Sequence, residues 1–279
     1  MTGLIDVGGG MRGIFGAGVL DYFMDNGLSA DYYIGVSAGS ANIASYLADQ
    51  RGRTYRFYTE YAKRPEYMSF HNFVHKHSYF DLDYVYSDLS SPDGEDPLDF
   101  EKFLSTDTPF YTVATKASDG KAKYFTIDDY SPANCEVLKA SCAIPGVCCP
   151  RKIGDETYFD GGVADPIPVE KALKDGCDKV ILILTKPIDY VKRPEYFKPV
   201  YSKVLKDYPL IVEGLNNRHN VYNEGVKKAI EYQKEGKVEI ISPKGGYYLT
   251  AFTKSENELK NLYDDGYRAA KDIMQKIDA

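Results

Sequence analysis

The amino-acid sequence predicts an α/β fold of three layers, with a mostly parallel central sheet between helices. Short apolar segments alternate with longer amphipathic segments along the chain, which is the order typical of parallel sheets. The run Val-Ile-Leu-Ile-Leu at 180–184 is entirely apolar, as expected of a central strand that helices cover on both faces. Because neither an internal repeat nor a low-complexity linker interrupts the 279 residues, we expect a single domain over 1–279.

The first half of the predicted fold begins with two strand–helix units. In both units the apolar residues of the helix recur at helical spacing, and Gly27 closes the first helix. A further helix with alternating charges covers 54–63, within a helical, aromatic-rich insertion that we expect over about 52–104. The strands and helices of the two units, in chain order, are 4–7, 13–26, 32–36 and 38–49.

The second half of the chain predicts a strand pair, a buried strand and a long final helix. The turn Ser118-Asp119-Gly120 separates two strand-like segments, and Pro145-Gly146 ends the helix that follows them. From about residue 190 we expect a helical extension. The elements expected here are strands at 110–114 and 124–127, a helix over 134–142, strands at 180–184 and 238–241, and a helix over 255–277.

Composition and charge exclude several classes of function. The net charge of −7 argues against nucleic acid as a main partner, because neutralising phosphates requires a basic face. No apolar stretch reaches the ~18 residues of a transmembrane helix, and the first residues lack a signal-peptide pattern. Five cysteines without C-x-x-C spacing indicate reduced thiols. We therefore expect a cytoplasmic protein, peripheral at the membrane if it contacts one.

The pentapeptide at 35–39, Gly-Val-Ser-Ala-Gly, fits the G-x-S-x-G pattern of a nucleophile elbow. In this elbow a strand turns sharply into a helix, and the glycines leave room for the turn. The central serine, Ser37, is thereby held in a strained conformation with its hydroxyl open to a substrate and to a base. The pattern also occurs by chance in globular proteins, so its neighbours decide whether Ser37 is a nucleophile.

A glycine loop at 8–13 follows the first strand and opens the first helix. It satisfies G-x-G-x-x-G, the fingerprint of a dinucleotide site, but that site requires an acidic residue at the end of the next strand. Asp31 stands at the start of that strand instead. The alternative is an oxyanion hole, since unpaired N–H groups at the mouth of a helix can stabilise a tetrahedral intermediate. A nucleotide-dependent oxidoreductase and a loop needed only for packing remain open.

A carboxylate after a third apolar run is a candidate base for Ser37. Asp160 is followed by Gly161 and Gly162, a combination that by itself is usually a turn. A Ser-His-Asp triad in α/β-hydrolase order requires a histidine after the acid. The histidine that follows Asp160 in the chain is His219, which lies in a polar helical stretch. The other histidines precede the acid in an aromatic, irregular region: His71, His75 and His77. A Ser–Asp dyad is the simpler alternative, provided that burial raises the basicity of Asp160 or that the proton transfer is late and assisted by oxyanion donors.

With these three motifs in this order, the sequence resembles the patatin-like phospholipases of bacterial type, which are a family of acyl hydrolases. The matching motifs are G-G-G-x-R-G at 8–13, G-x-S-x-G at 35–39 and D-G-G at 160–162. The segment 140–146 also looks like the family's lead-in to the aspartate. The resemblance covers residues 3 to about 185, and it implies a patatin-like fold and cleavage of lipid acyl esters by a Ser–Asp dyad.

The resemblance implies a role for each matched residue. Ser37 is the nucleophile and Asp160 is the base. Arg12 occupies the family's basic position, where it either orients the loop or holds a phosphate. The backbone N–H groups that form the oxyanion hole belong to Gly9, Gly10 and Met11. The remaining motif glycines support the turns: Gly8, Gly13, Gly35, Gly39, Gly161 and Gly162.

Two further segments have open interpretations. Aromatic side chains concentrate between Tyr55 and Tyr86, where they form either a lid or acyl-chain wall, or a helical subdomain packed on the core. If they wall an apolar channel, we expect Phe70 and Phe73 to contact the acyl chain. The amphipathic segment 196–208 carries apolar side chains between lysines, which suits either a membrane surface or solvent.

These observations predict a serine acyl hydrolase of phospholipase A or lysophospholipase type. A small-ester or thioester hydrolase on the same dyad is one alternative, and an inactive lipid-binding or regulatory relative is another. We expect neither a cofactor nor a metal ion, because backbone donors meet the developing charge and no acidic or histidine cluster has ligand spacing. The expected partners are a lipid or other acyl ester and, transiently, a membrane surface.

Overall fold

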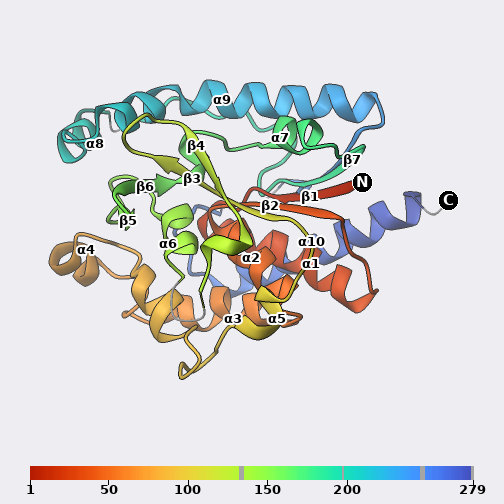
Figure 1. Ribbon diagram of the computed structural model, residues 1–279, viewed down its shortest axis with the longest axis horizontal. Helices are drawn as coiled ribbons and strands as arrows, with labels where there is room; N and C mark the ends of the chain where they lie inside the picture. Colours follow the sequence, from red (N-terminus) through yellow and green to blue (C-terminus); the bar gives the residue numbers. More distant parts are fainter. Residues whose placement is uncertain (132–134, 197, 246–248, 278–279) are drawn as a thin grey trace.

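The chain folds into a central sheet between two layers of helices, an α/β architecture (Figure 1). The structure is a computed structural model, and it describes residues 1–131, 135–196, 198–245 and 249–277. In this part of the chain the strand order is β5-β6-β3-β2-β1-β7-β8, with β4 paired to β3 outside this path. The strands are β1 (Thr2–Asp6), β2 (Tyr32–Val36), β3 (Phe110–Lys116), β4 (Ala122–Phe125), β5 (Arg151–Ile153), β6 (Glu156–Asp160), β7 (Lys179–Ile183) and β8 (Val238–Ile241).

The sheet is mostly parallel, as the sequence predicts. Strands β3, β2, β1, β7 and β8 pair in this order, each parallel to the next. The predicted strand pair at 110–114 and 124–127 is present as β3 and β4, which are antiparallel. On its other side β3 pairs with a second antiparallel hairpin, β5 and β6, which we did not expect from the sequence.

Alternate side chains of the central strands belong to two separate apolar cores. Leu4 of β1 and Ile183 of β7 pack in the core of one face, while Ile5 and Leu182 pack in the core of the other. All four side chains are fully buried. Successive side chains of a strand point to opposite faces, so a strand covered on both sides must be apolar throughout. The run at 180–184 is therefore correctly predicted as a central strand.

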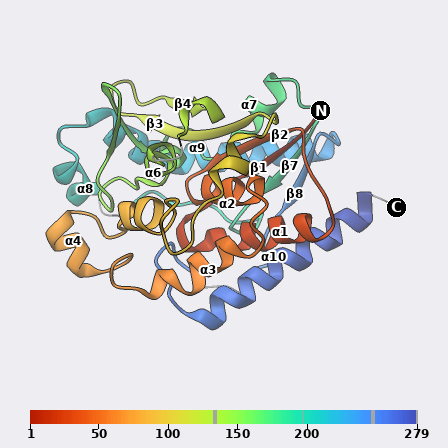
Figure 2. The ribbon, with the colours of Figure 1, turned by 60° about the horizontal axis from the view of Figure 1, so that its bottom comes forward.

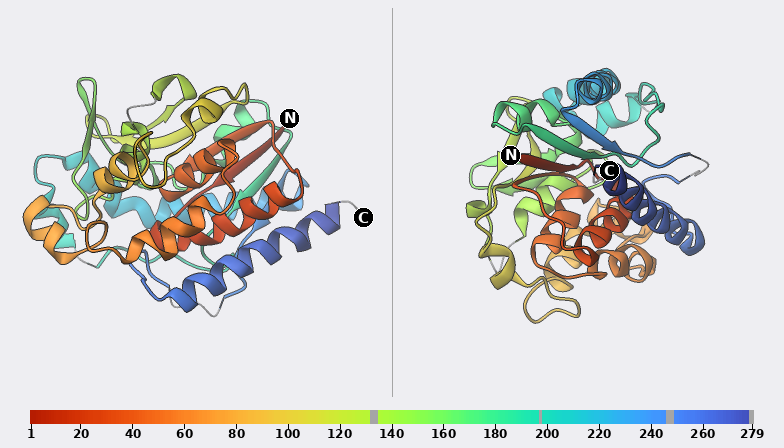
Figure 3. Two further views of the ribbon diagram at one scale, coloured as in Figure 1. Left: turned by 90° about the horizontal axis from the view of Figure 1, so that it is seen from below. Right: turned by 90° about the vertical axis from the view of Figure 1, so that its right-hand side faces the viewer.

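The helices cover both faces of the sheet (Figures 1 and 3). Helices α1, α2, α6 and α10 lie on one face, and α7 and α9 lie on the other. The helices are α1 (Ile14–Asp25), α2 (Ala38–Leu47), α3 (Arg53–Thr59), α4 (Phe70–Lys76), α5 (Phe100–Leu104), α6 (Glu136–Cys142), α7 (Val169–Lys174), α8 (Lys198–Val204), α9 (Pro209–Lys234) and α10 (Glu256–Ile277). Asn134 of the helix predicted over 134–142, and Phe197 of the amphipathic segment, lie outside the described residues.

The C-terminal helix α10 packs along α1 with close backbone contact (Figures 2 and 3). A Cβ atom on Gly18 would lie 2.1 Å from the carbonyl oxygen of Tyr263, and one on Gly266 would lie 2.1 Å from that of Phe15. Only glycine permits this approach of two helices. The last helix is thus part of the core on this face of the sheet.

The sheet brings three separate segments of the chain together. Strands β1 and β2 are adjacent and parallel, so the loops that follow them leave the same edge of the sheet. Strand β6 runs in the opposite direction and ends where Asp160 pairs with Ala114 of β3. Val36, the last residue of β2, pairs with Val113 of the same strand β3. The glycine loop, Ser37 and Asp160 therefore meet at one crevice.

Candidate active site

Ser37 stands at the turn between β2 and α2, in a conformation that is strained for any residue with a side chain. Its backbone angles are φ 55° and ψ −131°, and such sparsely populated conformations persist where the surrounding structure enforces them. The flanking glycines allow the turn. A Cβ atom on Gly35 would lie 2.3 Å from Ser40 Cα, and one on Gly39 would lie 2.1 Å from the carbonyl oxygen of Asp6.

The side chain and the backbone of Ser37 have separate partners. The hydroxyl Oγ donates a hydrogen bond of 2.6 Å to Oδ2 of Asp160. The backbone N–H donates to Oγ of Ser141 at 2.9 Å, and that hydroxyl donates in turn to the carbonyl of Val113 at 2.6 Å. Ser141 thereby ties the strained elbow to β3. Its segment, 140–146, belongs to the resemblance noted above, but nothing in the sequence indicated this contact.

Asp160 is buried and held by the backbone around it. Its N–H donates to the carbonyl of Ala143 at 2.9 Å, and its Oδ1 accepts the N–H of Gly162 at 2.8 Å. Burial raises the pKa of the carboxyl, although Arg218, the Ser37 hydroxyl and the Gly162 N–H act in the opposite direction. A carboxylate with a raised pKa is a stronger base than an exposed aspartate, which is the property a Ser–Asp pair requires.

The four histidines of the chain lie away from this pair. His71 and His75 are exposed on α4, with their rings 4.3 Å apart, and His77 is exposed just after that helix. His219 lies on α9, where its Nδ1 is buried without a hydrogen-bond partner among the described residues. It does not line the cavity that contains Ser37 and Asp160, although its neighbour Arg218 does.

The glycine loop presents free backbone donors beside Ser37. Gly8, Gly9 and Gly10 have positive φ angles of 61°, 125° and 60°, which favour glycine. The N–H groups of Gly9 and Gly10 have no acceptor among the described residues, and both residues line the Ser37 cavity. The N–H of Met11, by contrast, donates to the carbonyl of Ala251 at 3.2 Å. The prediction that Met11 is an oxyanion donor is therefore wrong, because its N–H already donates to a carbonyl in the loop before α10.

Asp6 is a site residue that sequence reasoning missed. It is fully buried at the end of β1, where its Oδ1 accepts the N–H of Gly8 at 2.9 Å and its Oδ2 accepts from Nδ2 of Asn42 at 2.8 Å. Burial raises the pKa of Asp6 to about 6. The carboxyl connects the glycine loop to α2. Its signal in the sequence is an acid between apolar residues directly before the glycines.

Asp31, at the other end of the neighbouring strand β2, binds the backbone of Thr2 and cannot serve a dinucleotide there.

An apolar cavity opens at Ser37 and runs beside α2. Its walls come mainly from the aromatic-rich insertion, whose side chains also pack in the core on this face of the sheet. The principal wall residues are Phe57, Tyr58, Tyr67, Phe80, Val85 and Tyr86. Phe70 and Phe73 are a wrong prediction for this wall. They lie on the outer side of α4 with exposed fractions of 73% and 40%.

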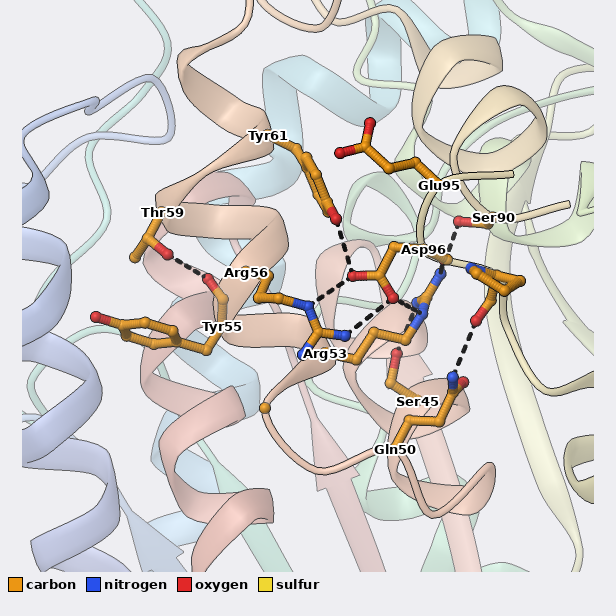
Figure 4. A network of polar contacts seen from close by, with 12 residues as sticks. Ser45, Gln50, Arg53, Tyr55, Arg56, Thr59, Tyr61, Ser90, Glu95 and Asp96 are labelled. Atoms are coloured by element: carbon orange, nitrogen blue, oxygen red, sulfur yellow. Dashed lines mark hydrogen bonds and ion pairs between the residues drawn. The ribbon is translucent and has the colours of Figure 1, made fainter. Parts of the chain in front are cut away.

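Ser45 and Arg53 line the end of the apolar cavity away from Ser37, and both belong to a polar network (Figure 4). Arg53 donates to Oγ of Ser45 at 3.0 Å, to Oγ of Ser90 at 2.8 Å and to the carbonyl of Asp96 at 2.8 Å. Arg56 makes two hydrogen bonds, of 2.7 and 3.0 Å, to the carboxylate of Asp96. Ser45 follows Ser37 by about 12 Å along α2, given a rise of about 1.5 Å per residue. The cavity is thus apolar beside Ser37 and polar at its end.

A second cavity also contains Ser37, and we call it the polar cavity because four basic and two acidic side chains line it. It contains Ser37, Asp160 and the glycine loop; part of its remaining wall comes from the segment 144–147, and most of the rest comes from the C-terminal third of the chain. The basic side chains in this wall are Lys186, Lys192 and Arg218, with Arg12 from the loop itself. In the described part of the chain no group of three or more His, Cys, Asp or Glu side chains is placed to hold a metal ion.

Comparisons with known proteins show which family the sequence is similar to. The model of the family described as patatin-like phospholipase matches residues 7–173, and that of a domain of unknown function, DUF6363, matches 208–279. The uncharacterised protein YjjU of Escherichia coli is 32% identical over 200 residues, which are 70% of this chain and 55% of YjjU. The chain thus spans about half the length of that relative.

Two more distant similarities were also found. The uncharacterised NTE family protein Rv1063c of Mycobacterium tuberculosis is 32% identical over 75 residues, which are 27% of this chain and 20% of that protein. The crystal structure of VipD from Legionella pneumophila aligns with 99% of this chain and 66% of that chain, at 12% identity and a TM-score of 0.47. The family model covers more than half of the residues, including Ser37 and Asp160. The chain therefore belongs to the patatin-like phospholipase family.

Proposed function

We propose that this protein is a serine acyl hydrolase that cleaves carboxylic esters of lipids, of phospholipase A or lysophospholipase type. The observation that carries the proposal is the hydrogen bond from Ser37 to Asp160, made at a strained elbow between an apolar and a polar cavity. A lipid ester has the matching halves, an apolar acyl chain and a polar alcohol. The acyl chain enters the apolar cavity, and the alcohol part occupies the polar one.

In the first step Oγ of Ser37 attacks the carbonyl carbon of the ester and transfers its proton to Oδ2 of Asp160. The negative charge that develops on the former carbonyl oxygen is stabilised by the N–H groups of Gly9 and Gly10. The tetrahedral intermediate then expels the alcohol, which takes the proton from Asp160. The product of this step is an acyl ester on Ser37.

In the second step water transfers a proton to Asp160 and attacks the acyl ester. The same two N–H groups stabilise the second tetrahedral intermediate. Its collapse breaks the bond to Oγ of Ser37, which recovers its proton from Asp160, and releases the fatty acid. The hydrogen bond from Gly162 to Oδ1 keeps the carboxylate oriented in both steps.

We predict that the specificity constant for nitrophenyl esters rises with acyl length and then levels off. Each buried CH₂ contributes about 0.8 kcal/mol, or about fourfold in the specificity constant. The rise ends where the acyl chain reaches Arg53 and Ser45, because the cavity ends at these two side chains and a longer chain has no further apolar wall to contact. The measurement is kcat/KM for a series of esters from acetate to dodecanoate.

Two variants test whether this dependence belongs to the apolar cavity. Ala41 lines the cavity one helical turn after Ser37, so Ala41→Leu should lower the ratio of long-chain to acetate turnover. Phe70→Ala is the matched control, since Phe70 lies outside the cavity, and it should keep the wild-type ratio. Hydrolysis confined to acetate esters would contradict a lipid substrate and favour the small-ester hydrolase.

We further propose that helices α4 and α8 contact the membrane surface that supplies the substrate. They lie at the same end of the molecule (Figures 1 and 2). Their exposed apolar side chains include Phe70 and Val74 on α4 and Val200 and Val204 on α8, all between 52% and 73% exposed. Tyr201 of α8 lines the polar cavity, so this surface adjoins the cavity. In the described residues no helix is long and apolar enough to cross a membrane.

We predict that the double variant Val200→Ser, Val204→Ser sediments less with anionic lipid vesicles than the wild type does. Loss of exposed apolar side chains weakens insertion into the lipid headgroup region. Turnover of a soluble nitrophenyl ester serves as the control for folding. Equal sedimentation of the two proteins would refute the role of α8.

A further inference from the structure

The polar cavity at Ser37 is positively charged in a protein that is negatively charged overall. Four basic side chains and two carboxylates line it, an excess of two positive charges, whereas the whole chain has a net charge of −7. The carboxylates are those of Asp160 and Glu195. Side chains of one sign concentrated in a cleft raise the local concentration of ligands of the opposite sign.

Arg12 contributes a basic side chain to this wall from the glycine loop itself. Its Nε is buried without a hydrogen-bond acceptor in the described part of the chain. Its guanidinium lies against the glycine loop, since a Cβ atom on Gly9 would be 3.0 Å from Nη2 of Arg12. A buried charged donor without an acceptor is destabilising, and native structures usually supply one. The cavity beside the oxyanion hole is where an acceptor could bind.

The other three cations surround the same space. Lys186 Nζ lies 4.9 Å from the ring centre of Tyr190. Nζ of Lys192 and Nη1 of Arg218 both pair with Oε1 of Glu195, at distances of 3.0 and 3.9 Å. Burial lowers the pKa of Lys186 and Lys192, and the neighbouring cations lower each further. The repulsion between these side chains is incompletely compensated by acids, and a bound anion would relieve it.

Arg218 and Glu195 also connect this cluster to the catalytic pair. Arg218 Nε donates to the carbonyl of Gly162 at 2.7 Å, and the N–H of Gly162 donates to Asp160. The cations therefore lie on the Asp160 side of Ser37, and none of the four lines the apolar cavity. In the proposed reaction that side receives the alcohol part of the ester.

We propose that this cavity binds a phosphate group on the alcohol part of the substrate, and that the enzyme prefers lipids whose headgroup has a net negative charge. The proposal rests on the proposed function, because the orientation of the alcohol follows from the acyl chain in the apolar cavity. Convergent arginine and lysine donors match phosphate oxygens. A choline headgroup would add a positive charge to this cluster of cations, which is unfavourable.

The test compares two substrates with the same acyl chain, a monoacylglycerol 3-phosphate and the monoacylglycerol that lacks the phosphate. We expect the wild type to prefer the phosphate ester, and Lys186→Gln and Lys192→Gln each to reduce the ratio of the two kcat/KM values about tenfold. Lys234→Gln is the matched control. It removes one charge about 24 Å along α9 from Arg218 and should leave the ratio unchanged. An unchanged ratio in both lysine variants would overturn the proposal.

Calorimetry with the Ser37→Ala protein distinguishes the source of the phosphate. Glycerol 3-phosphate should bind, more weakly when Lys186→Gln is added, and inorganic phosphate should bind less tightly than glycerol 3-phosphate. Tighter binding of inorganic phosphate, with no substrate preference in the wild type, would indicate a free-anion site and overturn the headgroup proposal. If the wild type hydrolyses no ester at all, the proposed function fails. In that case binding of glycerol 3-phosphate that depends on Lys186 would still support the anion site. A lack of such binding would refute the anion site as well.

Discussion

Replacing Ser37 by alanine is expected to abolish ester hydrolysis, with a fall in kcat of about 10⁴ or more. The variant removes the only atom that the proposed mechanism makes covalent with the acyl group. The hydrogen bond to Asp160 is lost as well, so no general-base route through Ser37 remains. The measurement is the turnover of a nitrophenyl ester under conditions where the wild type is saturated.

A glycine at position 37 separates loss of chemistry from loss of folding. Ser37 has φ 55° and ψ −131°, a conformation that glycine adopts without the steric cost of a Cβ atom. We therefore expect Ser37→Gly to be inactive and to have a free energy of unfolding about 1 kcal/mol higher than that of Ser37→Ala, which loses the same hydrogen bond but keeps a Cβ atom in the strained conformation. Measurable turnover by either folded variant would contradict the assignment of the nucleophile.

Replacing Asp160 by asparagine is expected to lower kcat by about 10³ to 10⁴, which is the loss seen when a serine hydrolase loses its acidic partner. An amide keeps the volume of the carboxylate but cannot take the proton of Ser37. His219→Ala is the matched control, because it removes the histidine that a triad would require. We expect that variant to keep most of its activity, and a comparable collapse would show that a histidine is the base.

The same carboxylate sets the acid limb of the pH profile. The ionised form of Asp160 is the base, so activity falls as the pH is lowered through the pKa of Asp160. Burial raises that pKa above its ordinary value of about 3.9. We therefore expect the acid limb of kcat/KM to lie above the pH at which a free aspartate titrates, and the limb should be absent from the residual activity of Asp160→Asn.

Much of the fold was predictable because its signals are local. Apolar periodicity identified the central strands and the helices between them, and glycine patterns marked the turns at Ser37 and after Asp160. Strand β6 was not predicted, because it is short and its apolar and polar residues alternate only weakly. That omission matters for the site, because only the antiparallel direction of β6 explains how Asp160 returns to Ser37.

The parts of the site that were not predicted depend on tertiary contacts. Met11 has the motif position of an oxyanion donor, but Ala251, 240 residues later in the chain, accepts its N–H. Phe70 and Phe73 have the composition of a wall, and only the orientation of α4 shows that they face outward. Arg218 lies outside the three motifs, and it reaches the catalytic pair because α9 packs over Gly162.

The most direct test of the central proposal is to label the protein with a fluorophosphonate probe and to map the modified residue by mass spectrometry. The probe reacts with a serine only if its hydroxyl is activated and an oxyanion hole accepts the phosphonyl oxygen. We predict one modified residue, Ser37, with no labelling of Ser37→Ala and strongly reduced labelling of Asp160→Asn. Modification of a different serine, or a wild-type protein that hydrolyses no ester and reacts with no probe, would contradict the account. The second outcome would indicate an inactive lipid-binding relative.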